Sequence, residues 1–191
     1  MNIVTERLLL RDFSMDDLDS IYELVYADSV VKDDWSGRQG TPGEMKRGFA
    51  EEWIAPTSEY GLKALALKEN GSLIGLMGFQ RYEPGENTSW LGLESDPGHK
   101  VGGDPDFVEV ELTYALGRSY WGKGYATEMG KALIEYGFSA LGIHRIINSV
   151  RVNNDHSIGL MRRLGFRIEA NIHPTSTGTN GILDNNTTGP L

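Results

Sequence analysis

The sequence predicts a single mixed α/β domain, on three observations. The chain has 191 residues, which fits one domain and is long enough to bury a substantial core. Strand-like and helix-like segments follow one another in the order β-α-α-β-β-β-β-α-β-α, with no internal repeat and no linker between domains. Two β-rich runs flank Asn70 and Gly71, which is a strong signal for a β-hairpin with a type I′ turn.

The first half of the chain alternates between strand and helix signals. Residues 5–13, "TERLLLRDF", alternate weakly between apolar and polar side chains and predict the first strand. Residues 14–27 have apolar side chains at helical spacing, and Ser14 is a suitable N-cap. Residues 32–43 are polar and contain glycine, which predicts a loop, and residues 44–55 predict a second helix that ends before a proline.

The second half of the chain shows the clearest strand–helix alternation. Its expected strands are residues 89–94, 107–116 and 144–152, its expected helices are residues 126–142 and 155–166, and its expected loop is residues 95–106. The residues from about 175 onward are rich in Thr, Asn and Gly. They hold at most one weak strand, and we expect their end to be mobile.

Composition and charge exclude several classes of protein. The sequence has no cysteine, which excludes disulfides, thiolate metal sites and a cysteine nucleophile. A formal net charge of −9 argues against a nucleic-acid binder and is compatible with a cationic substrate. The apolar runs are too short and interrupted to cross a bilayer, and the charged N-terminal residues do not form a signal peptide. We therefore expect a cytoplasmic protein with no membrane partner.

A glycine-containing turn, "SYWGKGYATE" at residues 119–128, joins a predicted strand to a predicted helix. The first amides of a helix have no intrahelical partners and carry partial positive charge from the helix dipole. Gly122 and Gly124 lack the side chains that would block an approaching phosphate, and Lys123 adds a positive charge. The turn is neither a P-loop nor a complete dinucleotide fingerprint, because Thr127 stands where the third glycine would be. A bound phosphate or pyrophosphate and a plain tight connection are both compatible with it.

Two longer segments connect this turn with a known family. Residues 109–138, "EVELTYALGRSYWGKGYATEMGKALIEYGF", and then residues 148–166, "NSVRVNNDHSIGLMRRLGF", resemble the GNAT acyltransferase superfamily, above all its branch of ribosomal-protein N-terminal acetyltransferases. The segments "TERLLLRDF" and "NGSLIGLMGF" match the same branch, so that the resemblance covers roughly residues 3–170. It implies a mixed, mostly antiparallel central sheet flanked by helices. It also implies acetyl transfer from acetyl-CoA to an amine by direct attack on the thioester.

The resemblance further implies which residues bind acetyl-CoA. The glycine turn corresponds to the family's Q/R-x-x-G-x-G/A element for the pyrophosphate, which here comprises Trp121, Gly122, Lys123, Gly124, Tyr125 and Ala126. Trp121 replaces the usual Gln or Arg and so removes one hydrogen-bond donor. The backbone of Tyr114 and Leu116 falls where family members hold the pantetheine amides. Asn154 and Ser157 match an N-x-x-S element beside the pantetheine arm and the thioester.

Glu111 is the candidate for accepting the proton of the amine. A primary amine with a pKa near 10 is protonated at pH 7, and producing its free base costs roughly 4 kcal/mol. Period two places Glu109, Glu111 and Thr113 on one face of the predicted strand, and Glu111 matches the glutamate of the family's E-x-G-Y element. It would act through water, or after burial raises its pKa. Otherwise it is a counter-ion for the ammonium, or one side chain of a solvated strand face.

Ser157 is the candidate donor to the leaving thiolate. Many family members have a tyrosine four residues further on, where this chain has Met161. A thiol pKa near 8.5 makes the thiolate a tolerable leaving group, so that a strict acid is not required. Helix capping is the alternative role of Asn154 and Ser157.

The sequence leaves three functions open, namely an acetyl-CoA-dependent N-acetyltransferase, a non-catalytic CoA- or nucleotide-binding module, and a protein that sequesters an amine without modifying it. The acidic and hydroxyl motifs together favour the first. The sequence does not identify the acceptor amine, and it neither indicates nor excludes a homodimer. We expect no metal, because the acidic segment from Asp96 to Asp106 is typical of a solvated, glycine-rich turn.

Overall fold

The residues described by the computed structural model are 1–34, 43, 47–49, 54, 59–81, 107–170 and 178–185. The chain forms two compact units, which share strand β5 and helix α4. The first unit comprises Met1–Gln80 and Thr113–Leu133, and the second comprises Arg81–Leu112 and Ile134–Leu191. The predicted strand at 89–94 and the predicted loop at 95–106 lie outside the described residues, as does most of the predicted helix at 44–55.

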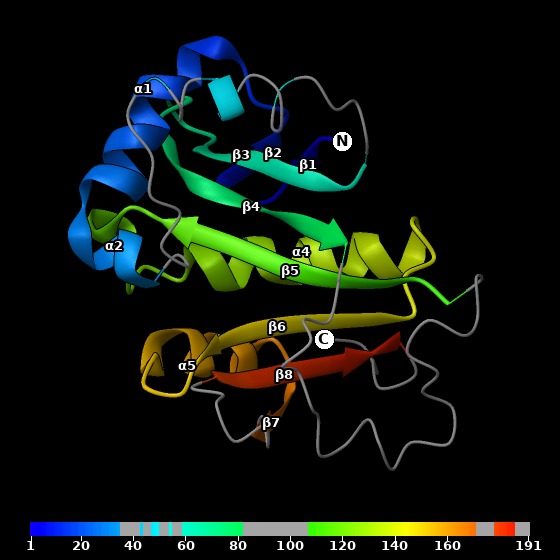
Figure 1. Cartoon of the computed structure of the whole chain (residues 1–191). Coiled ribbons are helices and arrows are strands. Elements are labelled where there is room, and N and C mark those ends of the chain that lie inside the picture. The colour runs from blue at the N-terminus through cyan, green and yellow to red at the C-terminus, as the bar shows by residue number, and fades with distance from the viewer. Residues whose placement is uncertain are drawn as a thin grey trace. The chain divides into compact units, whose positions relative to one another are not determined.

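The described strands form one mixed sheet with the strand order β1-β2-β3-β4-β5-β6-β8-β7 (Figure 1). The strands are Ile3–Val4 (β1), Leu8–Arg11 (β2), Gly61–Leu67 (β3), Leu73–Arg81 (β4), Glu109–Leu116 (β5), Arg145–Arg151 (β6), Arg167–Ala170 (β7) and Gly178–Asp184 (β8). The helical segments are Met15–Asp17 (η1), Leu18–Ile21 (α1), Tyr22–Ala27 (η2), Ser29–Asp34 (α2), Arg118–Tyr120 (η4), Tyr125–Ser139 (α4) and Asp155–Arg163 (α5). Among the registers that the structure defines, β5 and β6 are parallel and the other neighbours are antiparallel. The predicted mixed, mostly antiparallel sheet flanked by helices is confirmed.

The apolar core of the first unit forms between its N-terminal helical segment and its strands. The helical segment contributes Ile21, Val25, Tyr26 and Val31, and the strands contribute Leu62, Ala64, Leu73, Leu76 and Ala115. The helical segment begins after Ser14, as predicted, and the Ser14 N–H donates to the Asp17 carboxylate at 2.8 Å. The helical spacing of apolar residues in the sequence therefore places one face of this segment against the strands.

The hairpin of β3 and β4 is confirmed, but its turn is not the predicted type I′ turn. The Leu67 N–H donates to the Ser72 carbonyl at 2.9 Å, so that residues 68–71 form a longer loop. Gly71 has a φ of +73°, which favours glycine. Asn70 Oδ1 accepts a hydrogen bond from the Ser72 N–H at 3.0 Å, and this side-chain bond stabilises the longer loop.

The segment after residue 175 holds one strand in the second unit, as the sequence allowed. Gly178–Asp184 forms β8, which pairs with β6 on one side and with β7 on the other. Ile182 and Leu183 are buried, and so are the polar residues Thr179 and Asn180. Two neighbouring strands satisfy the backbone of β8, so that its polar composition does not prevent a strand here. Mobility of the final residues stays a prediction, since residues 186–191 lie outside the described part of the chain.

Gly181→Ala is expected to destabilise the second unit by about 2 kcal/mol, because the core there has no room for another methyl group. A Cβ at this position would lie 2.5 Å from the sulfur of Met161 on α5 and 2.9 Å from Cδ1 of Phe166. Urea unfolding measures the difference from the parent. Gly159→Ala is the control, since its Cβ would meet only the flexible end of Arg163 and alanine favours a helix. Equal stability of Gly181→Ala and the parent would show that α5 does not pack on β8 in this way.

Candidate active site

The glycine turn lies in the first unit, between β5 and α4. Gly122 and Gly124 have φ angles of +72° and +81°, a region that is open to glycine and strained for other residues. The Glu128 N–H donates to the Gly124 carbonyl at 2.9 Å, which places the N–H groups of residues 125–127 at the helix start. Gly122, Lys123 and Gly124 are exposed, and a Cβ at Gly122 would meet nothing within 4 Å. The turn therefore combines open space with the positive end of a helix.

The side chain of Trp121 is used inside the first unit. Its indole Nε1–H donates to the Leu116 carbonyl at 2.7 Å, and the ring packs against the apolar core of that unit. Any contribution of Trp121 to a phosphate site must therefore come from its backbone. On β5, Tyr114 is half-buried and Leu116 is buried. The predicted cofactor roles of these three residues stay predictions.

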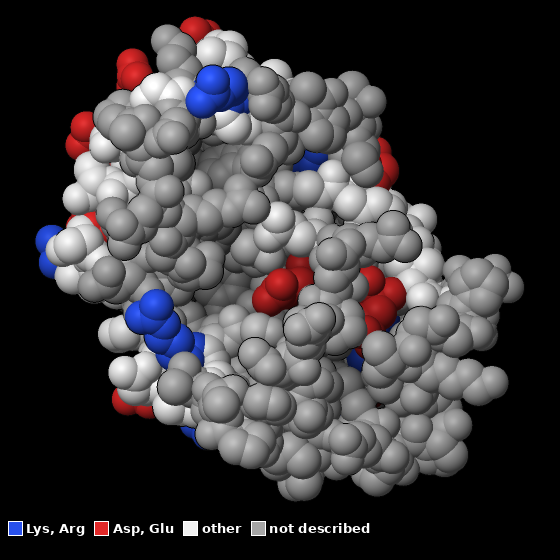
Figure 2. Space-filling view, in the orientation of Figure 1, with Lys and Arg blue, Asp and Glu red and all other residues white. Residues whose placement is uncertain are grey.

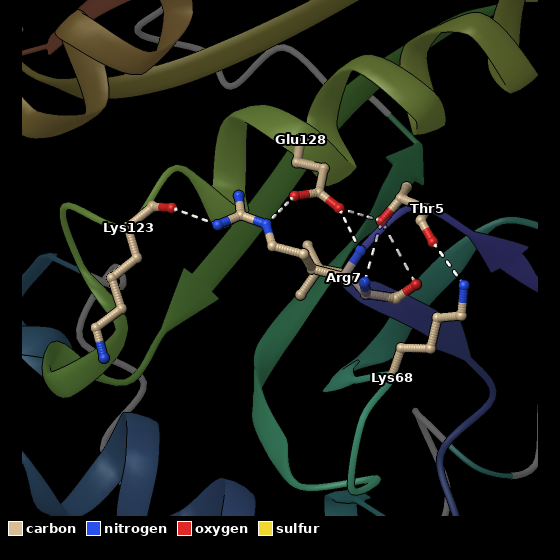
Figure 3. A network of polar contacts seen from close by, with 6 residues as sticks. Thr5, Arg7, Lys68, Lys123 and Glu128 are labelled. Carbon is tan, nitrogen blue, oxygen red and sulfur yellow. Dashed lines mark hydrogen bonds and ion pairs between the residues drawn. The ribbon is translucent and has the colours of Figure 1, made fainter.

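Arg7 and Glu128 meet beside the glycine turn, and sequence reasoning assigned neither of them a role (Figure 3). Arg7 Nε donates to Glu128 Oε2 at 2.7 Å, and Arg7 Nη1 donates to the Lys123 carbonyl at 3.1 Å. Thr5 Oγ1 and the Arg7 N–H donate to Glu128 Oε1 at 2.6 and 2.9 Å. The guanidinium also lies 4.7 Å from the centre of the Tyr125 ring. The local signal for this network in the sequence is an acidic residue in the first turn of a helix.

Hydrogen bonds stabilise the ionised form of the Glu128 carboxylate. Burial acts to raise the pKa of this group, but the hydrogen bonds from Thr5 and Arg7 outweigh burial and lower the pKa below its ordinary value. The hydrogen bond to Glu128 also raises the pKa of Arg7. An ion pair between Arg7 and Glu128 therefore joins the residues before β2 to the first turn of α4. Ala126, in the same helical turn, is half-buried.

Glu111 lies in the second unit, on the first half of β5. The predicted alternation is confirmed, since Val110 and Leu112 are buried whereas Glu109 and Glu111 are half-buried. The Ser149 N–H of β6 donates to Glu111 Oε1 at 3.4 Å. Burial raises the pKa of Glu111, although the hydrogen bonds from Ser149 act in the opposite direction. Figure 2 shows acidic side chains over the part of the second unit where β5 and β6 run.

Glu109, two residues before Glu111, belongs to a group of charged side chains around the buried Arg145. Arg145 Nη1 lies 3.8 Å from Glu109 Oε2, and Arg145 Nε donates to Asp184 Oδ1 at 2.5 Å. Burial raises the pKa of Glu109, while Arg145 opposes this effect and Asp184 adds to it. Glu109 Oε2 is buried and has no hydrogen-bond partner among the described residues. Since a buried cation faces Glu109, Glu111 is the stronger candidate for a base on this strand.

The ladder between β5 and β6 ends at Glu111. In the described residues, the parallel register joins Glu109–Glu111 to Arg145–Ile147, although both strands continue beyond this point. A side chain makes the next contact, because Asn148 Nδ2 donates to the Leu112 carbonyl at 2.5 Å. The candidate base therefore stands at the last residue pair of a ladder.

Asn154 and Ser157 form a cap at the start of α5. Asn154 Oδ1 accepts a hydrogen bond from the Ser157 N–H at 3.0 Å, which supports the capping alternative for this pair. This bond uses the backbone of Ser157 and not its hydroxyl group. Met161, at the position of the family's tyrosine, is buried against β8 and brings no hydroxyl group to the site. The predicted roles of Asn154 and Ser157 toward acetyl-CoA stay predictions.

Metal ligation has no candidate in the part of the chain that the structure describes, where no three His, Asp or Glu side chains are grouped to hold an ion. The acidic segment from Asp96 to Asp106 lies outside that part, as does His173. The ring of His144 stacks on Phe107, and its Nδ1 accepts a hydrogen bond from the Val108 N–H at 3.1 Å. The absence of a metal stays a prediction.

The chain matches known acetyltransferases over most of its length. The acetyltransferase (GNAT) domain family matches residues 7–167. YnaD, an uncharacterized N-acetyltransferase of Bacillus subtilis (strain 168), is 29% identical over 169 residues, which cover 88% of this chain and 84% of that protein.

Several solved structures share the fold, and two of them are complexes with CoA. RimL, a ribosomal L7/L12 α-N-protein acetyltransferase in complex with coenzyme A, matches with a TM-score of 0.69 and 17% identity, covering 95% of this chain and 96% of the other. A spermidine N-acetyltransferase from Vibrio cholerae, in complex with CoA and spermine, matches with a TM-score of 0.68 and 16% identity, covering 95% and 98%. The family match over residues 7–167 shows that the chain belongs to the GNAT acetyltransferase family, as its motifs predicted.

Proposed function

We propose that the protein is an N-acetyltransferase that moves the acetyl group of acetyl-CoA to a primary amine by direct attack. The observation that carries this proposal is the exposed turn at the start of α4, with its two glycines of positive φ. Two of the solved structures that share the fold are complexes with CoA, which supports the same cofactor here.

The glycine turn is the proposed site of the CoA diphosphate. A phosphate comes closest to a helix start where no Cβ intervenes, and Gly122 and Gly124 provide such positions. Lys123, exposed between them, adds a positive charge. The backbone of Tyr114 and Leu116, on the strand that leads into the turn, is the proposed track of the pantetheine arm. Asn154 is proposed to lie beside that arm.

Glu111 is the proposed proton acceptor. Glu111 takes one proton from the ammonium, directly or through water, and so frees the lone pair of the nitrogen. The nitrogen then attacks the thioester carbon, so that a C–N bond forms, the C–S bond breaks, and the second proton of the nitrogen passes to solvent or to the departing thiolate. Because burial raises the pKa of Glu111, this carboxylate accepts a proton more readily than an exposed glutamate does. The thiolate leaves with the electron pair of the C–S bond, and Ser157 Oγ is the proposed hydrogen-bond donor to it.

The acceptor class stays open between protein N-termini and small amines. An α-amino group with a pKa near 8 needs only about 1.4 kcal/mol to lose its proton at pH 7, whereas an alkyl amine needs roughly 4 kcal/mol. The net charge of −9 is compatible with either cation. No helix in the described part of the chain has the length and apolarity to cross a membrane. We further propose that the protein is cytoplasmic and forms a homodimer.

Release of free thiol from acetyl-CoA, measured over a panel of peptides with free N-termini, polyamines, aminoglycosides and amino acids, tests the proposed function. We expect thiol release that depends on the presence of one class of amine. CoA binding without thiol release for any amine would instead identify a non-catalytic binding module. Amine binding without CoA binding would identify a sequestration protein.

A further inference from the structure

We propose that Arg7 is a positioning residue for the CoA diphosphate, which it serves by holding the Lys123–Gly124 peptide in the orientation that binds phosphate. This inference rests on the proposed function. It concerns a residue that precedes β2 and lies more than a hundred positions from the turn in the sequence. All of its contacts are within the first unit.

The contacts of Arg7 fix its guanidinium against the turn from several directions. Nη1 donates to the Lys123 carbonyl at 3.1 Å, and Nε donates to Glu128 at 2.7 Å (Figure 3). The guanidinium carbon lies 4.7 Å from the centre of the Tyr125 ring, an arrangement typical of a cation–π contact. A Cβ placed on Gly124 would be 3.4 Å from Nη2, so that the third nitrogen lies against the turn as well.

The bond to the Lys123 carbonyl determines where the next N–H group points. In a planar trans peptide, the C=O and N–H groups point in opposite directions. Because the Lys123 oxygen points at Arg7, the Gly124 N–H points away from Arg7. A cation bound to the carbonyl also polarises the peptide and makes its N–H a stronger donor. Without this bond, the Lys123–Gly124 peptide, in a turn with a glycine on either side of the lysine, would have more conformations to lose on binding a phosphate.

The Glu128 carboxylate holds both the side chain and the backbone N–H of Arg7 in place. The carboxylate accepts hydrogen bonds from Arg7 Nε, from the Arg7 N–H and from Thr5 Oγ1. These bonds attach the chain before β2 to the first turn of α4. The planar fork of arginine lets one side chain bind the carboxylate and the Lys123 carbonyl at once, which the single ammonium of lysine does less well.

The experiment compares Arg7→Gln and Arg7→Lys with the control Arg11→Gln. Arg11 makes a similar ion pair on β2, with its Nη1 and Nη2 at 2.7 and 2.8 Å from the Asp17 carboxylate. For Arg7→Gln we expect the Kd of CoA and the KM of acetyl-CoA to rise roughly tenfold, the effect of losing one charge-assisted hydrogen bond. We expect kcat at saturating acetyl-CoA to change less than twofold, and Arg11→Gln to match the parent in all three.

S-acetyl-pantetheine, which has the thioester but no diphosphate, separates positioning from general structure. Its kcat/KM should be the same for Arg7→Gln and the parent, and a loss with both thioesters would overturn the proposal. Unchanged CoA affinity in Arg7→Gln would also overturn it and would leave the proposed function standing. Failure of the parent to bind CoA would overturn both. If Arg7→Gln does not fold, Arg7→Lys keeps the charge and the stem and carries the same comparison.

Discussion

Glu111→Gln is expected to lower turnover of a primary amine about a hundredfold, the low end of the range for losing a general base. Glutamine keeps the shape of the side chain and can still accept a hydrogen bond from Ser149, but it cannot take up a proton. The glycine turn is untouched, so the KM of acetyl-CoA should change less than twofold. Steady-state thiol release at pH 6 to 9 measures both quantities.

Glu109→Gln is the matched control for this prediction, because it makes the same change two residues away on the same face of β5. Glu109 faces Arg145, so we expect its loss to affect stability and to leave turnover within a few-fold of the parent. Equal turnover of Glu111→Gln and the parent across the pH range would remove Glu111 from the mechanism. A hundredfold loss in Glu109→Gln alone would move the role of base to that residue.

Glu111→Gln should also make the protein more stable at neutral and alkaline pH. Burial raises the pKa of Glu111, so the folded protein holds this proton more tightly than the unfolded chain does. As pH rises from the ordinary pKa near 4.5 through the raised pKa of the folded protein, the unfolded chain releases this proton first. The folded state therefore loses stability relative to the unfolded chain over this range. Glutamine removes that loss. Its stabilising effect in urea unfolding should therefore be present at pH 8 and vanish below about pH 4.

Gly124→Val is expected to weaken CoA binding at least tenfold and to leave turnover at saturating acetyl-CoA nearly unchanged. The φ of +81° is costly for any β-branched residue, by about 1–3 kcal/mol, so the turn should shift to another conformation. The new side chain would also press on Arg7 Nη2 and disturb the guanidinium that holds the Lys123 carbonyl. Isothermal titration with CoA measures the affinity directly.

Gly142→Val separates the loss of a phosphate site from backbone strain alone. Gly142 follows α4, has a φ of +65°, and a Cβ there would meet nothing within 4 Å. This variant should therefore lose a similar amount of stability but keep the CoA affinity of the parent. If Gly124→Val also kept that affinity, the turn would be only a connection between strand and helix.

Local patterns in the sequence were enough to predict the turn, the helix after it and the face of β5 that carries Glu111. Each of these depends on residues within one turn or one strand, where glycine conformation and periodicity decide the structure. The contacts of Arg7 could not be found in this way. Arg7 and Glu128 are 121 residues apart, and only the pairing of distant strands brings them together.

The polar contacts of Trp121 and of the Asn154–Ser157 pair could not be found from short motifs either. Trp121 occupies a position in the turn where family members have a donor to phosphate, but its indole N–H donates to the Leu116 carbonyl. Asn154 and Ser157 satisfy both a family motif and a capping rule, and the structure shows the capping bond. In each case the neighbouring backbone decides what the polar atoms of the motif residue contact, and the role toward acetyl-CoA stays a prediction.

Strand β8 has a consequence for synthesis on the ribosome. It enters the sheet between β6 and β7, although both of these precede it in the chain. While translation proceeds from the N-terminus, β6 and β7 emerge with no strand between them, and each presents an open edge until residues 178–184 leave the exit tunnel. The sheet of the second unit is therefore closed by an insertion that occurs late, after translation has passed nearly all of the residues proposed to form the active site.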